Sequence, residues 1–197
     1  MQPSIFRNVH MYIKIWWNSK RLKILYLIYS IHNSIIIFLG SMVNVLVKKF
    51  GKSSMLGTWS LFFVIVFGLF SSIMYFRLIK DHKLWQRVFL AASAMLITVC
   101  FIAISFSEVF FIILIAIFGL VSFPLIPLIL EMITNDNKII PITVNNTFLF
   151  LCGQIVGLIL QFVFLSFDYF WPEISVWLIL YLIVGLQLLE FWLIRFF

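Results

Sequence analysis

Six long apolar stretches, separated by short polar segments, account for most of this 197-residue chain. Each stretch contains about the 20 residues that an α-helix needs to cross a hydrocarbon core of about 30 Å. Inside a bilayer the backbone must satisfy its own hydrogen bonds, and separate stretches of this length do so as helices. The sequence therefore predicts an all-α, polytopic membrane protein with six transmembrane helices. They cover approximately 22–46, 55–76, 88–106, 109–132, 142–167 and 174–194.

The composition leaves little room for a water-soluble domain. Hydrophobic residues make up 64% of the chain and charged residues 11%, whereas soluble domains contain about 25% charged residues. The polar segments are too short to bury a core of their own. We therefore divide the chain into a basic cytoplasmic or interfacial segment, 1–21, and a six-helix transmembrane domain, 22–197.

The net charge of +7 is explained by the distribution of the basic residues. If the N-terminus is cytoplasmic, eleven of the 14 Lys and Arg residues fall on the cytoplasmic side of the six spans. The three others are Lys48, Lys49 and Lys52. This asymmetry is the positive-inside bias of membrane proteins. We expect both termini to be cytoplasmic, with the basic side chains against anionic lipid head groups and no nucleic acid as partner.

The fourth stretch contains Gly119, Pro124 and Pro127. Two prolines three residues apart remove two backbone donors, which should kink or break the helix. Within a membrane such a break is tolerated only where protein or a cavity satisfies the freed backbone groups. The pattern fits a gating helix and a bent structural helix equally well, and these three residues are the hinge candidates of this stretch.

The fifth stretch is the most polar of the six. Asn146, Gly153, Gly157 and Gln161 recur at helical spacing and share a face, which Gln154 flanks. Amides are costly against lipid, so this face should look into the bundle or into water. The spacing of Gly153 and Gly157 lets another helix approach closely, and both are further hinge candidates. The face serves either for hydrogen bonding between helices or for lining a solute path.

The first stretch places Tyr29, His32 and Asn33 about a third of the way along its length. His32 is the one histidine within an apolar stretch. It can act as a proton relay or, more commonly, as a hydrogen-bonded structural residue. The carboxylates, Glu190 among them, lie near the ends of the stretches. Because ion-coupled carriers generally place carboxylates at the midplane, we expect facilitated diffusion.

Two segments match motifs of a transporter family. The loop 68–83 has Gly68, Lys80 and Lys83 at positions of a signature between helices 8 and 9, with Arg77 in place of its acidic residue. The fourth stretch matches a glycine–aromatic–Pro-Leu motif of helix 10. The matching residues are Gly119, Phe123, Pro124 and Leu125. Over about 23–195 the chain thus resembles the C-terminal six-helix half of a major facilitator superfamily transporter, in the branch of the feline leukaemia virus subgroup C receptor-related proteins.

The same resemblance assigns roles to residues of two other stretches. In the fifth, Gln154 matches a glutamine that contacts substrate in family members, and Phe150 replaces an asparagine. In the first, Tyr29 and Asn44 match, whereas Ile37 stands where the family has an aromatic ring. A cation cage needs a ring face beside the charge, so choline-like specificity is weakened.

The resemblance implies two three-helix inverted repeats and a carrier that rocks two six-helix halves around a midplane site. A second six-helix half, on the same or a separate polypeptide, is therefore an expected partner, together with a small organic solute and the lipid bilayer. The residues expected to contact the solute come from the first and fifth stretches. They are Gln154, Asn146, Gln161, Tyr29, His32 and Asn33.

Catalysis is not expected, because the chain lacks the motifs of zinc proteases, α/β-hydrolases and phosphate-binding loops. No cofactor or metal is expected either. The expected function is secondary transport, as a facilitator of a small organic solute such as an amine or another metabolite. The alternative is a non-transporting scaffold, an assembly subunit or a fragment of a twelve-span carrier, in which the polar face of the fifth stretch only binds a partner helix.

Overall fold

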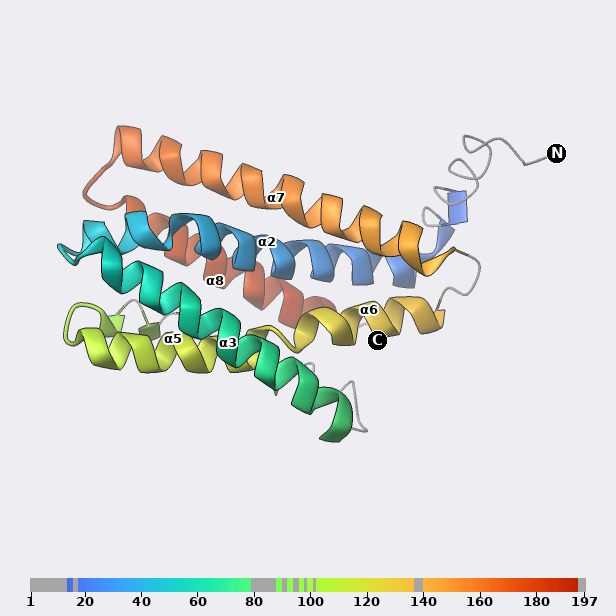
Figure 1. Ribbon diagram of the computed structural model, residues 1–197. Coiled ribbons are helices and arrows are strands. Elements are labelled where there is room, and N and C mark those ends of the chain that lie inside the picture. Colours follow the sequence, from blue (N-terminus) through green and yellow to red (C-terminus); the bar gives the residue numbers. More distant parts are fainter. Residues whose placement is uncertain are drawn as a thin grey trace.

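A computed structural model describes residues 14–15, 18–78, 88–89, 92–93, 96–97, 99–100, 102–136 and 140–194. Within these residues the chain forms helices, turns and loops, without strands (Figure 1). The helices named in Figure 1 are α2 (Lys20–Lys49), α3 (Ser54–Leu78), α5 (Glu108–Ser122), α6 (Leu125–Asp136), α7 (Ile142–Phe170) and α8 (Ser175–Leu193).

Five helical segments of the described part are long and apolar enough to cross a membrane, with α5 and α6 together forming one of them. They match the first, second, fourth, fifth and sixth expected stretches to within a few residues. The third stretch, 88–106, is described in short pieces with gaps between them, whereas most of segment 1–21 and the loop match at Lys80 and Lys83 lie outside the described residues. An all-helical bundle with several apolar spans is thereby confirmed.

Local side chains explain where the first long helix begins and ends. The Ser19 hydroxyl accepts a hydrogen bond from the Leu22 N–H at 3.3 Å and caps the start of α2. At the other end, Gly51 adopts a φ of 71°, which glycine tolerates without strain. Its N–H and that of Lys52 donate back to the carbonyls of Lys48 and Val47 at 2.9 and 3.2 Å, a Schellman ending.

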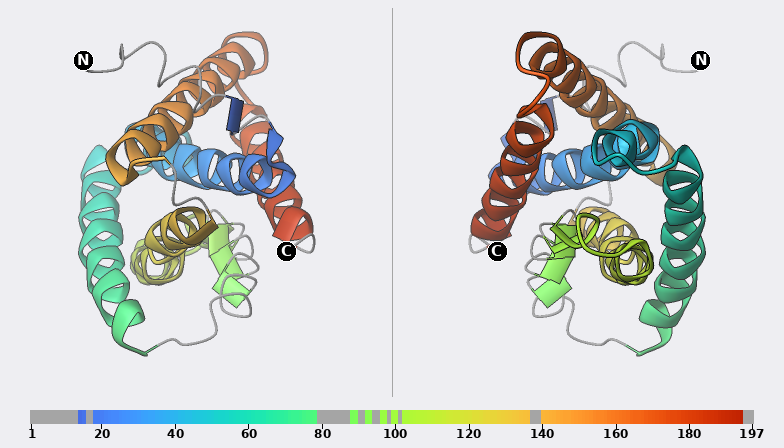
Figure 2. Two further views of the ribbon diagram at one scale, coloured as in Figure 1. Left: turned by 90° about the vertical axis from the view of Figure 1, so that its right-hand side faces the viewer. Right: turned by 90° about the vertical axis from the view of Figure 1, so that its left-hand side faces the viewer.

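Helix α2 is the central helix of the described bundle. It contacts α3, α6, α7 and α8, and Figure 2 shows it enclosed between them. In its most apolar 18-residue window 72% of the residues are buried, against 28% for α3 and for α7. Polar side chains on α2 are therefore held inside the protein, whereas α3 and α7 have wide outer faces.

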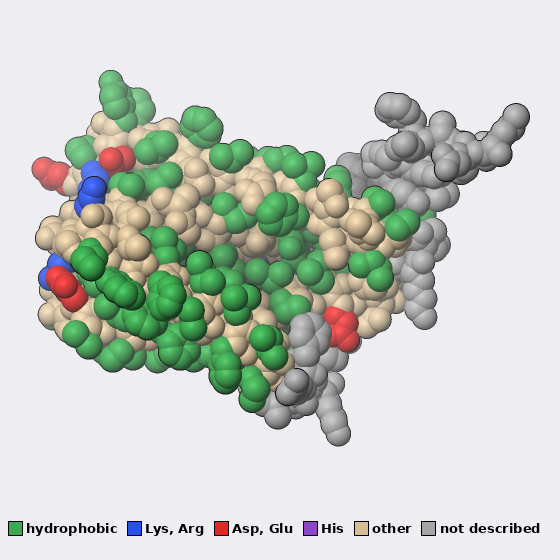
Figure 3. Space-filling model, viewed as in Figure 1, with side chains coloured by type: hydrophobic (Ala, Val, Ile, Leu, Met, Phe, Trp, Pro, Cys, Tyr) green, Lys and Arg blue, Asp and Glu red, His purple; other side chains and the backbone are tan. Residues whose placement is uncertain are grey.

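Those outer faces are apolar. Side chains that are large, hydrophobic and about half exposed or more include Trp59, Phe62 and Phe70 of α3, Phe162 of α7 and, on the neighbouring α8, Tyr181 and Leu188. Figure 3 shows such side chains over the body of the bundle and a group of charged side chains at its left end. A water-soluble protein rarely exposes apolar surface of this extent. The surface is that of a bundle whose sides face lipid.

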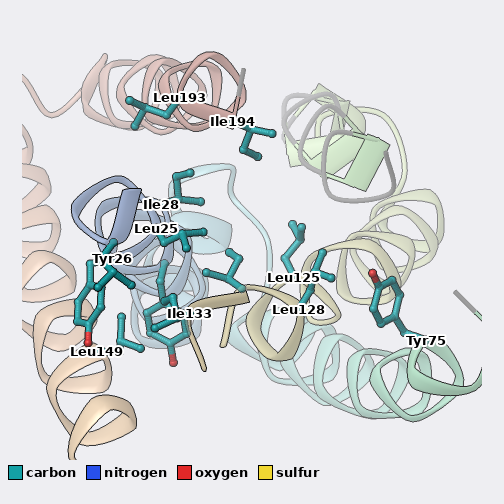
Figure 4. Close-up of a cluster of buried hydrophobic side chains, with 13 residues drawn as sticks. Leu25, Tyr26, Ile28, Tyr75, Leu125, Leu128, Ile133, Leu149, Leu193 and Ile194 are labelled. Carbon is teal, nitrogen blue, oxygen red and sulfur yellow. The ribbon is translucent and has the colours of Figure 1, made fainter. Parts of the chain in front are cut away.

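Buried apolar side chains fill the spaces around α2. In one cluster, Leu25 and Ile28 of α2 lie near Leu125 and Leu128 of α6 (Figure 4). In another, the ring of Phe38 meets that of Phe164 edge-on at 5.9 Å, between α2 and α7. These contacts fix the rotation of α2 and so decide which of its polar residues face which neighbour.

Among the described helices, the two most extensive interfaces join α2 to α7 and α3 to α5. Glycines make both of them close. A Cβ on Gly157 of α7 would lie 3.1 Å from Cγ2 of Ile37 on α2, and one on Gly119 of α5 would lie 2.5 Å from the carbonyl oxygen of Val64 on α3. In terms of the expected spans, the first packs against the fifth and the second against the fourth.

Candidate functional site

The fourth span is interrupted at Phe123 and Pro124, between α5 and α6, as the sequence predicts. Pro124 has no N–H, and the Ile126 N–H donates to the Phe123 carbonyl at 3.2 Å. The Ser122 carbonyl therefore has no donor from its own helix. Pro127 adds no second break, because it lies in the first turn of α6, where backbone N–H groups have no helical partner.

His32 of α2 supplies the missing donor. Its Nε2 lies 2.9 Å from the Ser122 carbonyl oxygen. A carbonyl oxygen only accepts hydrogen bonds, so the Nε2–H donates and this nitrogen carries a proton. The bond links the central helix to the break in the fourth span and satisfies a carbonyl that lipid could not.

Glu190 of α8 lies on the other side of the imidazole. Its Oε2 is 3.4 Å from Nδ1 of His32, and the two side chains are 0% and 2% exposed. One turn earlier in α8, the buried Gln187 donates from Nε2 to the Ser93 hydroxyl at 3.3 Å. An internal polar site thus joins α2, the α5–α6 break and α8, and its imidazole and carboxylate can hold a proton between them.

The sequence interpretation missed this site in one respect. Glu190 lies only three residues before the end of α8, and it was expected among the carboxylates near the ends of the spans. The structure buries it completely. Its place near the end of the span is as expected, whereas its burial inside the bundle was not. The signal available was Gln187 followed three residues later by Glu190, which puts two polar groups on one helix face.

On α7, the two glycines of the polar face are positions of close helix approach, as their spacing predicts. A Cβ on Gly153 would collide with the side-chain amide of Asn33, which is itself buried on α2. Gly157 stands against Ile37 and the Ser34 backbone in the same way. Helix α7 continues without interruption through both glycines.

The other residues of that face lie along the seam between α2 and α7. Gln161 donates from Nε2 to the Ser41 hydroxyl at 2.9 Å. Asn146 and Gln154 are half-buried. Asn146 is 15 residues from Gln161, or about 22 Å along the helix. The six expected contact residues therefore do not converge on a single point, although His32, the buried Tyr29 and Asn33 are close together in α2.

Several buried polar atoms of the described part have no hydrogen-bond partner within it. They include Nδ2 of Asn33 and Oδ1 of Asn145 and Asn146. Buried polar groups are nearly always paired with protein, water or a ligand. Asn145 is the more deeply buried of the two adjacent asparagines, 3% exposed, although the helical-face argument favoured Asn146.

An apolar pocket lies between α2, α3 and α5. Its lining includes Leu39, Gly40, Ser60, Val64, Phe118 and Phe123. The Ser60 hydroxyl is occupied by the Leu56 carbonyl at 2.7 Å, so the walls offer no open polar side chain. None of the six expected contact residues lines this pocket. Phe123 does, and the pocket thus adjoins the break in the fourth span.

Comparison with protein-family models, with curated proteins and with solved structures finds no match to this chain. The resemblance to the major facilitator superfamily therefore depends on the motif residues alone.

Proposed function

We propose that this chain is one six-helix half of a secondary transporter of the major facilitator type. It would carry a small organic solute together with a second six-helix half, and it would be a relative of the feline leukaemia virus subgroup C receptor-related branch. The observation that carries the proposal is the pairing of α2 with α7 and of α3 with α5.

Inverted repeats account for that pairing. If the first three spans and the last three are two copies of one unit, each span corresponds to the one three places later. The first span then corresponds to the fourth, and the fifth to the second. The α2–α7 interface becomes the α5–α3 interface under this exchange, and these are the two largest interfaces of the described bundle.

The interrupted fourth span gives independent support. Carriers of this kind build their sites from discontinuous helices near the midplane. Here the break at Phe123 and Pro124 adjoins an apolar pocket and is held by His32. We propose that this junction moves during transport. The pocket would take the apolar part of the solute, while the unpaired amides of Asn33 and Asn146 and the nearby Gln154 would bind its polar part.

The arrangement of helix ends supports the proposed topology. The N-terminal end of α2, the C-terminal end of α6 and the N-terminal end of α7 lie together in Figure 1. Arg21 and Asp136 form an ion pair there at 2.6 Å. Most of the basic residues of the chain flank this end in the sequence. By the positive-inside bias it would face the cytoplasm.

A second function has its own support. The bond from Gln161 to Ser41 and the contact of Gly153 with Asn33 use the polar face of α7 to join it to α2. A non-transporting scaffold or assembly subunit needs nothing more than such contacts. In that case the polar residues of α7 serve to hold helices together.

Alanine substitutions separate the two functions. Gln154→Ala and Asn146→Ala remove half-buried amides without changing the glycine contacts. For a carrier we expect normal accumulation in the membrane and reduced solute uptake, measured against the amount of protein at the surface. For a scaffold we expect reduced accumulation or loss of a co-purifying partner. Uptake equal to that of the parent in both variants would exclude these residues from the solute site.

A further inference from the structure

We infer that His32 and Glu190 form a proton-binding site, and that removal of one proton from it releases the α5–α6 junction from α2. The inference rests on the proposed carrier function for its biological use, since it would make transport proton-coupled. The proton site itself can be tested without any solute.

Each nitrogen of the imidazole faces one oxygen atom. The Nε2–H donates to the Ser122 carbonyl at 2.9 Å, and Nδ1 faces Oε2 of Glu190 at 3.4 Å. An uncharged pair has one further proton, which lies either on the carboxyl or on Nδ1. With two protons there, or with none, the pair has a net charge, and a net charge is costly where both side chains are almost completely buried. The closed site therefore holds one exchangeable proton.

No other charge near the pair within the described residues sets its protonation. The only ionic partner of the Glu190 carboxylate there is the imidazole of His32. The surrounding helices contribute hydroxyl, amide and thiol groups, and one carboxylate about two turns beyond the break. These groups are Tyr29 of α2, Ser93, Ser122 of α5, Glu131 of α6, Cys152 of α7 and Gln187 of α8. The charge of the pair thus follows its own protons.

Loss of the exchangeable proton changes the bond to the broken helix. The pair then consists of a carboxylate and an imidazole with a single proton. A carboxylate is a stronger acceptor than a neutral carbonyl, so this proton moves to Nδ1 and bonds to Glu190. Nε2 becomes an acceptor that faces the Ser122 carbonyl oxygen, and two acceptors at this separation repel. The released proton passes to water, which must reach the site.

The result is a switch with a defined direction. With its proton, the pair holds Ser122 and closes the junction. Without it, the bond is lost, and the same carbonyl needs a donor that its own helix does not supply. Opening of the junction to water provides both that donor and solvation of the carboxylate. Binding and release of one proton are thereby linked to the one interruption among the described long helices.

Hydrogen exchange at the junction tests the inference. The amides of Phe123, Ile126 and Leu128 donate to backbone carbonyls of the junction at 3.2 to 3.3 Å. We would measure their deuterium uptake in the purified full chain in lipid nanodiscs over a series of pH values, corrected for intrinsic exchange. The expected result is protection that falls several-fold from the lowest to the highest pH of the series, as the pair loses its proton.

One substitution removes the exchangeable proton, and a second prevents its transfer to the bond with Ser122; both keep hydrogen bonds. In Glu190→Gln the amide donates to Nδ1 and leaves the Nε2–H on Ser122. In His32→Gln the amide can still donate to Ser122 but cannot transfer the proton. Glu190→Gln should give protection that is high and independent of pH, and His32→Gln should retain the bond to Ser122 over the whole pH series. Glu173→Gln, which removes an exposed carboxylate before α8, should behave as the parent.

The inference would be overturned if Glu190→Gln kept the pH dependence of protection. It would also be overturned if the parent showed no such dependence. Circular dichroism of each variant shows whether it folds. If one variant does not fold, the pH dependence of protection in the other variant tests the inference. Failure of the proposed carrier function is distinguishable from failure of the proton site. It would appear as absence of uptake in the parent, whereas the exchange measurement needs no solute.

Discussion

Gly119→Ala is the most direct perturbation of the α3–α5 interface on which the inverted-repeat proposal depends. The added Cβ would lie 2.5 Å from the carbonyl oxygen and 2.9 Å from Cα of Val64. Both are backbone atoms, so no side chain can rotate away. The two helices must separate by several tenths of an ångström or more, and overpacking of this kind costs about 1–3 kcal/mol.

Alanine also favours the helical state over glycine by about 0.5–1 kcal/mol, and a matched control is needed to remove that contribution. Gly185→Ala in α8 and Gly40→Ala in α2 add a Cβ with no atom within 4 Å. All three substitutions gain the same helix preference. The difference in unfolding free energy between Gly119→Ala and either control is therefore the overpacking term alone, about 1–3 kcal/mol.

Thermal unfolding in detergent micelles, followed by circular dichroism, measures this difference. In a chain of this size about 2–4 °C of Tm corresponds to each kcal/mol. Gly119→Ala should unfold below both controls, and the controls should unfold at or above the temperature of the parent. If Gly119→Ala is as stable as Gly185→Ala, the close contact of α3 with α5 is absent and the interface argument fails.

Three further outcomes follow from the same contacts. Glu190→Ala should lower the unfolding free energy by about 1–3 kcal/mol more than Glu190→Gln, because it leaves a buried imidazole nitrogen without a partner. Equal unfolding free energies of the two variants in a denaturant titration would contradict the pairing with His32. Pro124→Ala restores an N–H that can reach the Leu120 carbonyl, so the fourth span should be straighter than in the parent. The distance between spin labels on α5 and α6 measures this change. An unchanged distance would show that the proline does not cause the break. Lys49→Ala removes the ion pair with Asp168. Because both groups are partly exposed, the unfolding free energy should fall by less than about 1 kcal/mol. A larger loss of thermal stability would mean that this contact anchors α2 to α7.

The spans and the break were predictable because their causes are local. Length and apolarity define a membrane helix wherever it packs. The missing N–H of Pro124 disrupts its own helix whatever surrounds it. The Gly153–Gly157 spacing likewise predicts close approach of another helix, and α2 provides that helix.

The contact of His32 with Glu190 was not predictable in the same way. It joins the first span to the last, and it depends on how two helices are rotated about their axes. Helix α8 is apolar almost all round, so no amphipathic pattern shows which side faces inward. The freed carbonyl of Ser122 also has no sequence signal of its own. It is free because the Ile126 N–H donates to the Phe123 carbonyl instead.

The central claim, that the chain belongs to a carrier of a small organic solute, is tested most directly by an unbiased uptake measurement. Cells that produce the chain with its second half would be compared with cells that produce Gln154→Ala at equal surface amount and with cells that lack the protein. Small molecules inside the cells would be quantified by mass spectrometry. The account predicts at least one organic solute whose uptake depends on the protein and falls in the variant. Identical solute profiles in all three would contradict it.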